Sequence, residues 1–164
     1  MSALDETLSL EERVVALLKK HGLSVSTAES CTGGLLSGRI INVPGASDII
    51  GCAIVTYSND AKRKYLGVRK STLKKHGAVS SKCAKEMAKG ICRQTGADVG
   101  IATTGIAGPD GGTDDKPVGL VYIACCIGKK VKVQKFVFSG DRAQVRKQSV
   151  KAALKLTRNC LKEL

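Results

Sequence analysis

Two adjacent nucleophiles, the hydroxyl of Ser30 and the thiol of Cys31, lie in the segment 27–34 of this chain. An alternating apolar run at 23–28 precedes them, and a run with helical periodicity begins at Leu35. This pattern predicts a strand, a sharp turn and the start of a helix. Ser30 then lies at the end of the strand, beside backbone N–H groups that have no helical partner. Such a corner can bind an anion or stabilise an oxyanion next to a nucleophile.

The same turn also fits a simpler interpretation, because Ser and Thr are ordinary N-cap residues of helices. In that case Ser30 or Thr32 caps the helix and carries no chemistry. In the catalytic interpretation, the backbone N–H groups of Thr32, Gly33 and Gly34 hold an oxyanion or a phosphate. The two glycines would let a ligand approach the backbone closely. The pattern alone leaves both interpretations open.

Polar or glycine-rich segments follow three predicted strands. The strands are expected at 23–28, 49–57 and 98–104, the last two as buried strands. The segment 58–62 follows the second strand, and a segment at 105–116 with four glycines follows the third. Ligands of open α/β sheets bind outside the carboxyl ends of the strands, which favours a site here. The glycine-rich segment matches neither a P-loop nor a dinucleotide fingerprint, and a mobile surface loop is the alternative.

Helical patterns alternate with these strands. A capping box is expected at Ser9, a cap at Asn59 or Asp60, and another at Ser80 or Ser81. The helices are expected at 10–21, 35–42, 59–64, 71–76, 81–94 and 141–161, and two more strands at 118–127 and 131–138 form a hairpin. This order predicts an α/β fold, a compact three-layer α/β/α domain with a mixed sheet that includes one C-terminal β-hairpin. We expect residues 1–164 to form a single domain.

The chain is strongly basic, with 27 Lys and Arg against 14 Asp and Glu and a net charge of +13. Such a field attracts polyanions, and it would also favour a small substrate that bears a phosphate. The five Phe and Tyr residues are not clustered, and no helix-turn-helix or zinc-finger signature is present. We therefore expect a solvated basic surface that binds nucleic acid weakly and without specificity.

The seven cysteines form no Cys-x-x-Cys pair and no zinc-ligand spacing. Most lie in apolar contexts, which is typical of buried free thiols in a reducing compartment. No apolar run approaches the roughly 18 residues that a membrane span needs, and the first twelve residues are acidic and polar, unlike a secretory signal. We expect a cytoplasmic protein without a membrane partner.

Four ordered segments resemble a known family: 27–34, 43–47, 57–62 and 104–112. They are similar to the CinA C-terminal domain family, and the resemblance extends from about residue 10 to residue 161. Characterised members are nicotinamide mononucleotide deamidases, also called nicotinamide-nucleotide amidohydrolases. The chain resembles the stand-alone form, which lacks the N-terminal domain related to molybdopterin-binding proteins. The resemblance implies an α/β/α fold and hydrolysis of the nicotinamide carboxamide to nicotinic acid mononucleotide and ammonia.

The resemblance implies Ser30 as the nucleophile, Lys62 as the base and Tyr57 as a source of an assisting hydroxyl. The two histidines, His21 and His76, both fall at predicted helix ends beside a glycine, so a Ser-His-Asp triad is not expected. A lysine can be the base when its pKa is well below the ordinary value of roughly 10.4. The thiol of the neighbouring cysteine is the rival nucleophile, because a turn at a helix start activates thiols in the same way.

Further residues are expected to bind the substrate. Besides the backbone groups of the turn, one loop is expected to line the site next to the nicotinamide or the ribose. Its residues are Thr104, Gly105, Ala107 and Gly108. Arg142 and Arg146 lie one turn apart on one face of the last helix. Either could bind the substrate phosphate in bidentate fashion, and Arg142 is taken as the phosphate ligand.

Glu29 has two interpretations, because it can either orient the catalytic lysine or cap the helix. No cluster of metal ligands is apparent in the sequence, so we expect hydrolysis without a metal or a cofactor. We also expect the protein to be a homo-oligomer. Its expected substrate, which the family resemblance implies, is nicotinamide mononucleotide. The alternative is a non-catalytic module of the same fold that binds nucleotides or nucleic acid.

Overall fold

The computed structural model describes residues 7–164 of the chain. Five strands form one open sheet in the order β2-β1-β3-β4-β5. β1 (Val25–Glu29) lies parallel to both β2 (Ile50–Val55) and β3 (Val99–Gly105). β4 (Leu120–Ile127) and β5 (Lys130–Val137) continue the sheet in antiparallel fashion and form a hairpin. The predicted α/β fold with a mixed sheet and a β-hairpin is therefore confirmed.

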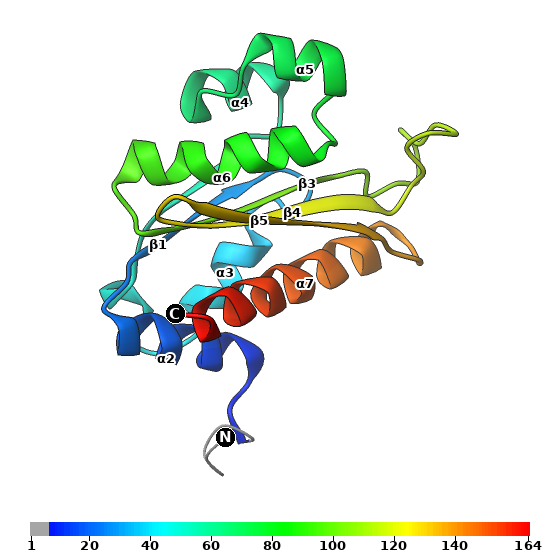
Figure 1. Ribbon diagram of the computed structural model, residues 1–164. Helices are drawn as coiled ribbons and strands as arrows, with labels where there is room; N and C mark the ends of the chain where they lie inside the picture. Colours follow the sequence, from blue (N-terminus) through cyan, green and yellow to red (C-terminus); the bar gives the residue numbers. More distant parts are fainter. Residues whose placement is uncertain (1–6) are drawn as a thin grey trace.

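Helices cover both faces of the sheet (Figure 1). Below the sheet in that view lie α2 (Leu10–His21), α3 (Leu35–Ile41) and α7 (Arg142–Lys162). Above it lies α6 (Ser81–Thr95), against which α4 (Asn59–Leu66) and α5 (Lys70–His76) pack. A short 3-10 helix, η1 (Ala46–Asp48), precedes β2. These are the three layers that the alternation of patterns predicted.

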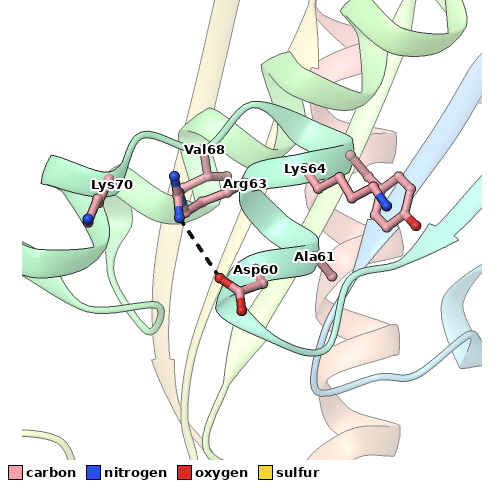
Figure 2. A pocket seen from close by; sticks show the side chains of 7 residues that line it. Asp60, Ala61, Arg63, Lys64, Val68 and Lys70 are labelled. Carbon is pink, nitrogen blue, oxygen red and sulfur yellow. Dashed lines mark ion pairs between the residues drawn. The ribbon is translucent and has the colours of Figure 1, made fainter.

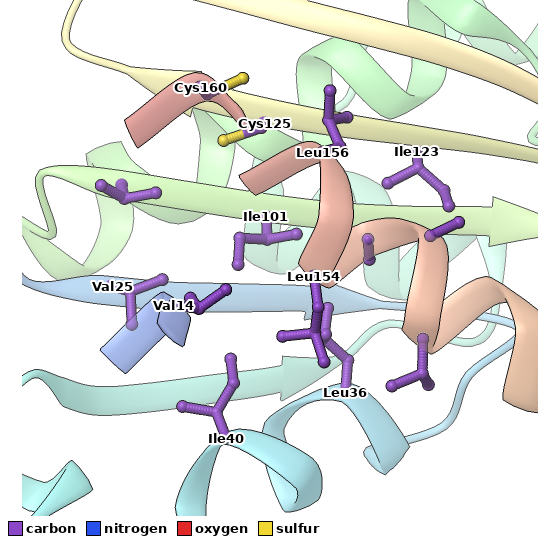
Figure 3. Packing of buried hydrophobic residues seen from close by; sticks show 14 of the residues in the cluster. Val14, Val25, Leu36, Ile40, Ile101, Ile123, Cys125, Leu154, Leu156 and Cys160 are labelled. Atoms are coloured by element: carbon purple, nitrogen blue, oxygen red, sulfur yellow. The ribbon is translucent and has the colours of Figure 1, made fainter. Parts of the chain in front are cut away.

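The larger hydrophobic core lies between the sheet and α2, α3 and α7 (Figure 3). Helix α7 contributes the buried residues Val145, Val150, Ala153, Leu154 and Leu161, which are the inward positions that its helical periodicity predicts. Aliphatic side chains at this spacing remove one full face of the helix from water, and this burial fixes the helix against the sheet.

Two local predictions need correction. β2 is not a buried strand, because it lies at the edge of the sheet and its residues alternate between intermediate and exposed. Helix α4 is capped by Ser58, whose hydroxyl accepts from the Ala61 N–H at 3.0 Å, and not by Asn59 or Asp60. The capping box at Ser9 is confirmed.

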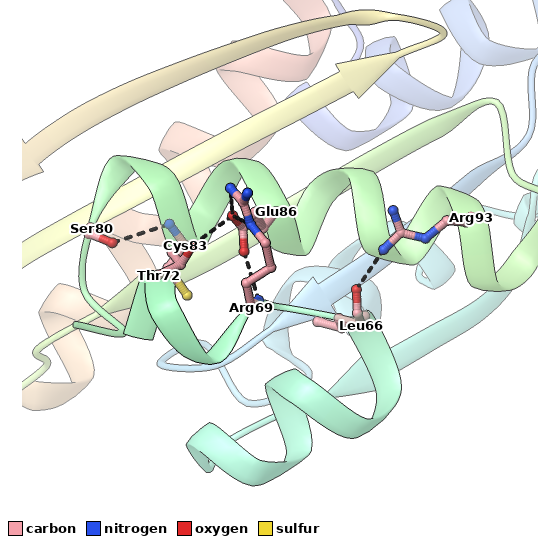
Figure 4. Close-up of polar contacts among 7 residues, drawn as sticks. All are labelled: Leu66, Arg69, Thr72, Ser80, Cys83, Glu86 and Arg93. Atoms are coloured by element: carbon pink, nitrogen blue, oxygen red, sulfur yellow. Dashed lines mark hydrogen bonds and ion pairs between the residues drawn. The ribbon is translucent and has the colours of Figure 1, made fainter. Parts of the chain in front are cut away.

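Side chains of α6 hold α4 and the start of α5 in place (Figure 4). Arg93 donates to the carbonyl oxygen of Leu66, at the end of α4, at 3.1 Å. Glu86 accepts from the Arg69 N–H at 2.9 Å and from the Thr72 hydroxyl at 2.7 Å. These contacts matter for function because α4 carries the candidate catalytic lysine.

Gly90 allows α6 to approach α4 closely, and its replacement should loosen this contact. A Cβ at Gly90 would lie 2.1 Å from the carbonyl oxygen of Leu66. We expect Gly90→Ala to lower the free energy of unfolding by about 1–3 kcal/mol, the usual cost of overpacking. Urea denaturation measures this change. Gly38→Ala in α3 is the matched control, since a Cβ there meets no atom within 4 Å; it should be neutral or stabilising by up to about 1 kcal/mol. Equal effects of the two changes would contradict the expectation.

Candidate active site

Ser30 lies in the turn between β1 and α3, and its side chain is almost buried, with 8% exposure. Its N–H donates to the carbonyl oxygen of Thr103 at 3.0 Å, which ties the turn to the end of β3. Neither Ser30 nor Thr32 caps α3, because the N-cap is Gly34 with φ 95° and no side-chain cap of its own. The interpretation of this turn as a simple Ser or Thr cap is therefore wrong.

The side chain of Glu29 takes over the capping of α3. Its carboxylate is fully buried and accepts five hydrogen bonds of 2.6–3.2 Å, from the hydroxyls of Thr27 and Thr32 and the N–H groups of Gly34, Leu36 and Ser37. Of the two roles considered for Glu29, the structure supports the cap. The Thr32 hydroxyl donates to Glu29, so the Thr103 hydroxyl, 2.7 Å away, must donate to Thr32.

Lys62 projects from α4 to the Ser30 hydroxyl. Its side chain is buried, with 1% exposure, and its Nζ lies 3.0 Å from Ser30 Oγ. Nζ also donates to the carbonyl oxygens of Thr56 at 2.8 Å and Tyr57 at 3.1 Å. The pair that the family resemblance implies as nucleophile and base is therefore in hydrogen-bond contact.

Burial lowers the pKa of Lys62, because the charged ammonium loses its hydration and neither backbone carbonyl carries a compensating charge. A neutral amine has two N–H donors and one lone pair. As an ammonium ion, Lys62 donates to Ser30 Oγ and to the Thr56 and Tyr57 carbonyls. When it loses one proton and keeps the two carbonyl contacts, its lone pair faces Ser30 Oγ. This is the arrangement a general base needs.

The backbone N–H groups of the turn divide into two sets. Gly33 donates to the Ser30 carbonyl at 3.1 Å and Gly34 donates to Glu29, so these predicted ligands of an oxyanion or phosphate already have partners. Within the described residues 7–164, no hydrogen bond takes up the N–H of Cys31 or Thr32. Two adjacent amides next to the nucleophile therefore have no hydrogen-bond partner among these residues, and both belong to buried residues, with Cys31 5% and Thr32 0% exposed.

The rival nucleophile Cys31 is poorly suited to the role. Its thiol is buried in the core between the sheet and α7, with 5% exposure. Burial raises the pKa of Cys31 to about 11. The reactive thiolate is thus disfavoured at neutral pH, in contrast to the activated thiols of cysteine enzymes.

Arg142, at the start of α7, joins two other predicted site residues at the surface. Its guanidinium donates to the Tyr57 hydroxyl at 2.9 Å and to the Gly108 carbonyl at 2.9 Å. The Tyr57 side chain is 61% exposed, so these three residues meet at the protein surface, and we refer to this cluster of Tyr57, Gly108 and Arg142 as the mouth. Tyr57 contacts Lys62 through its backbone carbonyl, whereas its hydroxyl bonds Arg142.

The remaining predicted binding residues serve mainly to place the loop after β3. Thr104 is buried and donates to the Ala78 carbonyl at 2.9 Å. Gly105 pairs with Val121, and a Cβ there would lie 2.6 Å from that side chain. Ala107 is buried in the core. Among the four predicted loop residues, only Gly108 contacts the arginine at the mouth through a hydrogen bond.

Arg146 has a structural role that the sequence did not reveal. Its Nε donates to the carbonyl of Cys31 at 3.0 Å and its Nη2 to that of Thr32 at 3.1 Å. The spacing of Arg142 and Arg146 by four residues indicated a shared helix face but not two different targets. His21 and His76 lie at the last positions of α2 and α5, as predicted for helix ends.

A hollow of about 550 Å³ on α4 lies apart from these residues (Figure 2). Its lining includes Asp60, Arg63, Lys64 and Tyr65, but neither Ser30 nor Lys62. The predicted catalytic residues Ser30 and Lys62 therefore lie in the nearly buried turn and not in this wider surface hollow.

The comparisons with known proteins identify the family and the fold of the chain. A family model described as the CinA C-terminal domain matches residues 7–161. The chain belongs to this family. The CinA-like protein of Kosmotoga olearia is 52% identical over 153 residues, which cover 93% of the chain and 37% of that protein. Proteins of Clostridium acetobutylicum and Clostridium novyi named as putative competence-damage inducible proteins are also matched over little more than a third of their length.

Solved CinA structures have the same fold. A CinA superfamily protein from Klebsiella pneumoniae matches with a TM-score of 0.91 and 38% identity, covering 94% of this chain and 97% of that chain. The competence/damage inducible protein CihA of Agrobacterium tumefaciens matches with a TM-score of 0.90 and 41% identity, covering 93% of each chain.

Two negative findings concern residues 7–164 alone. None of the helices described there is long and apolar enough to cross a membrane. The same part of the chain contains no group of three or more His, Cys, Asp or Glu side chains arranged to hold a metal ion.

Proposed function

We propose that the chain hydrolyses the carboxamide of nicotinamide mononucleotide to nicotinic acid mononucleotide and ammonia. The observation that carries the proposal is the buried contact between Lys62 Nζ and Ser30 Oγ at 3.0 Å. Membership of the CinA family, with its characterised deamidases, supplies the substrate class.

The first step is attack of Ser30 Oγ on the carboxamide carbon. Neutral Lys62 accepts the hydroxyl proton as the new C–O bond forms, while the carbonyl π electrons move to oxygen. The resulting oxyanion is stabilised by the free N–H groups of Cys31 and Thr32. Lys62, now an ammonium ion, retains the two carbonyl contacts that hold it against Ser30.

The second step is loss of ammonia. Lys62 returns its proton to the amide nitrogen, the C–N bond breaks, and an acyl ester on Ser30 remains. A water molecule then attacks this ester with Lys62 again as the base, which releases the carboxylate and restores the Ser30 hydroxyl. The sum is one amide and one water converted to one acid and one ammonia.

The phosphate end of the substrate is assigned to the mouth at Arg142. Two of the five N–H donors of this guanidinium bind Tyr57 and Gly108, and three remain for a phosphate. We expect Arg142→Met to raise the KM for nicotinamide mononucleotide by about tenfold or more, the loss of one charge-assisted contact. The matched comparison is nicotinamide riboside, which lacks the phosphate and whose hydrolysis should be nearly unaffected by the change.

Release of ammonia from nicotinamide mononucleotide by the purified chain tests the function directly. We expect turnover with the mononucleotide and much weaker turnover with free nicotinamide. No ammonia from the mononucleotide, under conditions in which the protein is folded by circular dichroism, would exclude the proposed activity.

A non-catalytic nucleic-acid-binding module is the second candidate, and the charge distribution favours keeping it. The segment 59–95, which spans α4, α5 and α6, holds eleven of the 27 basic residues and two of the 14 acidic ones. If this layer serves only solubility and substrate steering, DNA binding should be weak and should vanish at moderate salt. Salt-resistant, sequence-selective binding would favour the second candidate.

A further inference from the structure

We propose that Arg146 is a positioning residue of the oxyanion site: its guanidinium orients and polarises the Cys31–Thr32 peptide, so that the Thr32 N–H donates to the oxyanion. The inference rests on the proposed function only in taking Ser30 as the nucleophile. It assigns a role in the reaction to a side chain that contacts neither the nucleophile nor the base.

The direction of the Thr32 N–H follows from the two contacts of Arg146. Nε binds the Cys31 carbonyl at 3.0 Å and Nη2 binds the Thr32 carbonyl at 3.1 Å. In a planar trans peptide the C=O and the N–H point in opposite directions. The Cys31 carbonyl faces α7, so the N–H of the same peptide, which belongs to Thr32, faces away from α7.

The guanidinium also strengthens this N–H as a donor. A charged donor on a carbonyl oxygen forms a stronger hydrogen bond than a neutral one, and hydrogen bonds in series polarise one another. Negative charge that develops on the substrate oxygen therefore meets an N–H with enhanced positive character. The second contact holds the Thr32–Gly33 peptide, whose N–H closes the turn onto the Ser30 carbonyl.

The residues around Arg146 hold its side chain in place and leave its guanidinium without an ion-pair partner among residues 7–164. Val145 and Ser149, its neighbours on α7, are fully buried, which anchors this part of the helix. Gly33 leaves room for the guanidinium, since a Cβ there would lie 3.2 Å from Arg146 Nη2. Among residues 7–164, no carboxylate forms an ion pair with Arg146, so its guanidinium keeps both contacts to the carbonyls of the turn.

The two arginines of α7 thus have separable effects. Arg142 lies at the mouth, where it meets the bound substrate, and its loss should change KM. Arg146 lies behind the turn, where it affects the charge that forms during reaction, and its loss should change kcat. This split separates a positioning role from a binding role.

The experiment compares Arg146→Met and Arg146→Lys with the control Arg158→Met. Arg158 lies on the same helix, and its guanidinium bonds only the neighbouring Asn159 among the described residues. Two rates are measured: ammonia release, and covalent labelling of Ser30 by a fluorophosphonate, which needs the nucleophile and the oxyanion site but no nicotinamide. We expect Arg146→Met to lower kcat and the labelling rate on the order of 10²-fold, as for loss of one oxyanion donor.

Three further readouts exclude a merely structural role. KM should change by less than about threefold, because the lost interaction belongs to the transition state. The acidic limb of the pH profile should stay in place, since Arg146 does not contact Lys62. Arg146→Lys, which keeps the charge and the fold but cannot bind both carbonyls, should recover part of the labelling rate.

The proposal is overturned if both Arg146 variants, folded by circular dichroism, label at the wild-type rate. It is also overturned if the loss appears in KM alone, or if Arg158→Met has the same effect. If the wild type labels at Ser30 but releases no ammonia, the proposed substrate is wrong and the labelling ratio still decides the role of Arg146. A wild type that neither labels nor turns over removes the nucleophile and this inference with it.

Discussion

Ser30→Ala is expected to lower ammonia release from nicotinamide mononucleotide by about 10³-fold or more, the usual loss for a covalent nucleophile. The thermal midpoint should be nearly unchanged. The hydroxyl is bonded to Lys62 alone among the described residues, and Lys62 keeps the Thr56 and Tyr57 carbonyls when the hydroxyl is removed. Coupled ammonia detection and calorimetry on the same preparation measure the two quantities.

Cys31→Ala is the control for the nucleophile. The Cys31 thiol is buried with a raised pKa, so most of the turnover should remain, with a modest loss of stability from the missing sulfur in the core. Activity that survives Ser30→Ala and disappears in Cys31→Ala would transfer the nucleophile to the thiol.

Lys62→Arg should be almost as inactive as Lys62→Ala, with a loss of about 10²–10⁴-fold, which is the contribution of a general base. Arginine keeps the positive charge but does not lose its proton at any working pH, so it cannot accept the proton of Ser30. Binding of nicotinamide mononucleotide by calorimetry should be largely kept. If Lys62→Arg retains most of the turnover, Lys62 is an electrostatic anchor, and the Tyr57 hydroxyl becomes the next candidate for the proton.

The lowered pKa of Lys62 fixes the sign of two pH effects. The active form is the neutral amine, so kcat/KM should rise with pH through the lowered pKa and level off above it. The unfolded chain binds the Lys62 proton more tightly than the folded chain. The free energy of unfolding of the wild type, relative to that of Lys62→Ala, should therefore increase as the pH rises from the lowered to the ordinary lysine pKa. An acidic limb that persists in Lys62→Ala, measured on residual activity, would assign the limb to another group.

Part of the site could be predicted because it is local in sequence. A strand, a turn with two glycines and a helix start placed Ser30 at a strand end, and the family segments singled out Lys62. The contact between them joins residues 32 positions apart on different layers. Periodicity alone could not have predicted that α4 folds back far enough for Nζ to reach Oγ.

The roles that were missed depend on tertiary contacts. A glutamate before a serine gives no sign that it accepts five hydrogen bonds and replaces the expected hydroxyl cap. Whether an N–H in the turn is free depends on these partners, which is why Gly33 and Gly34 were expected to be ligands and Cys31 was not. β2 has an apolar composition suited to a buried strand, yet it lies at the edge of the sheet. The order of strands in a sheet depends on the whole fold and cannot be predicted from the sequence of one strand.

The buried carboxylate of Glu29 also makes the charge at the inner end of the site differ from the charge at its mouth. It brings a negative charge to the turn and offsets the guanidinium of Arg146 behind it, whereas Arg142 at the mouth has no ion-pair partner among residues 7–164. If the proposed function holds, a ligand with an anion at one end and an amide at the other should therefore bind in one direction only, with the amide inward and the anion outward. The chain would select substrates by the distance between those two groups, and an isomer with its anion beside the amide would be turned away.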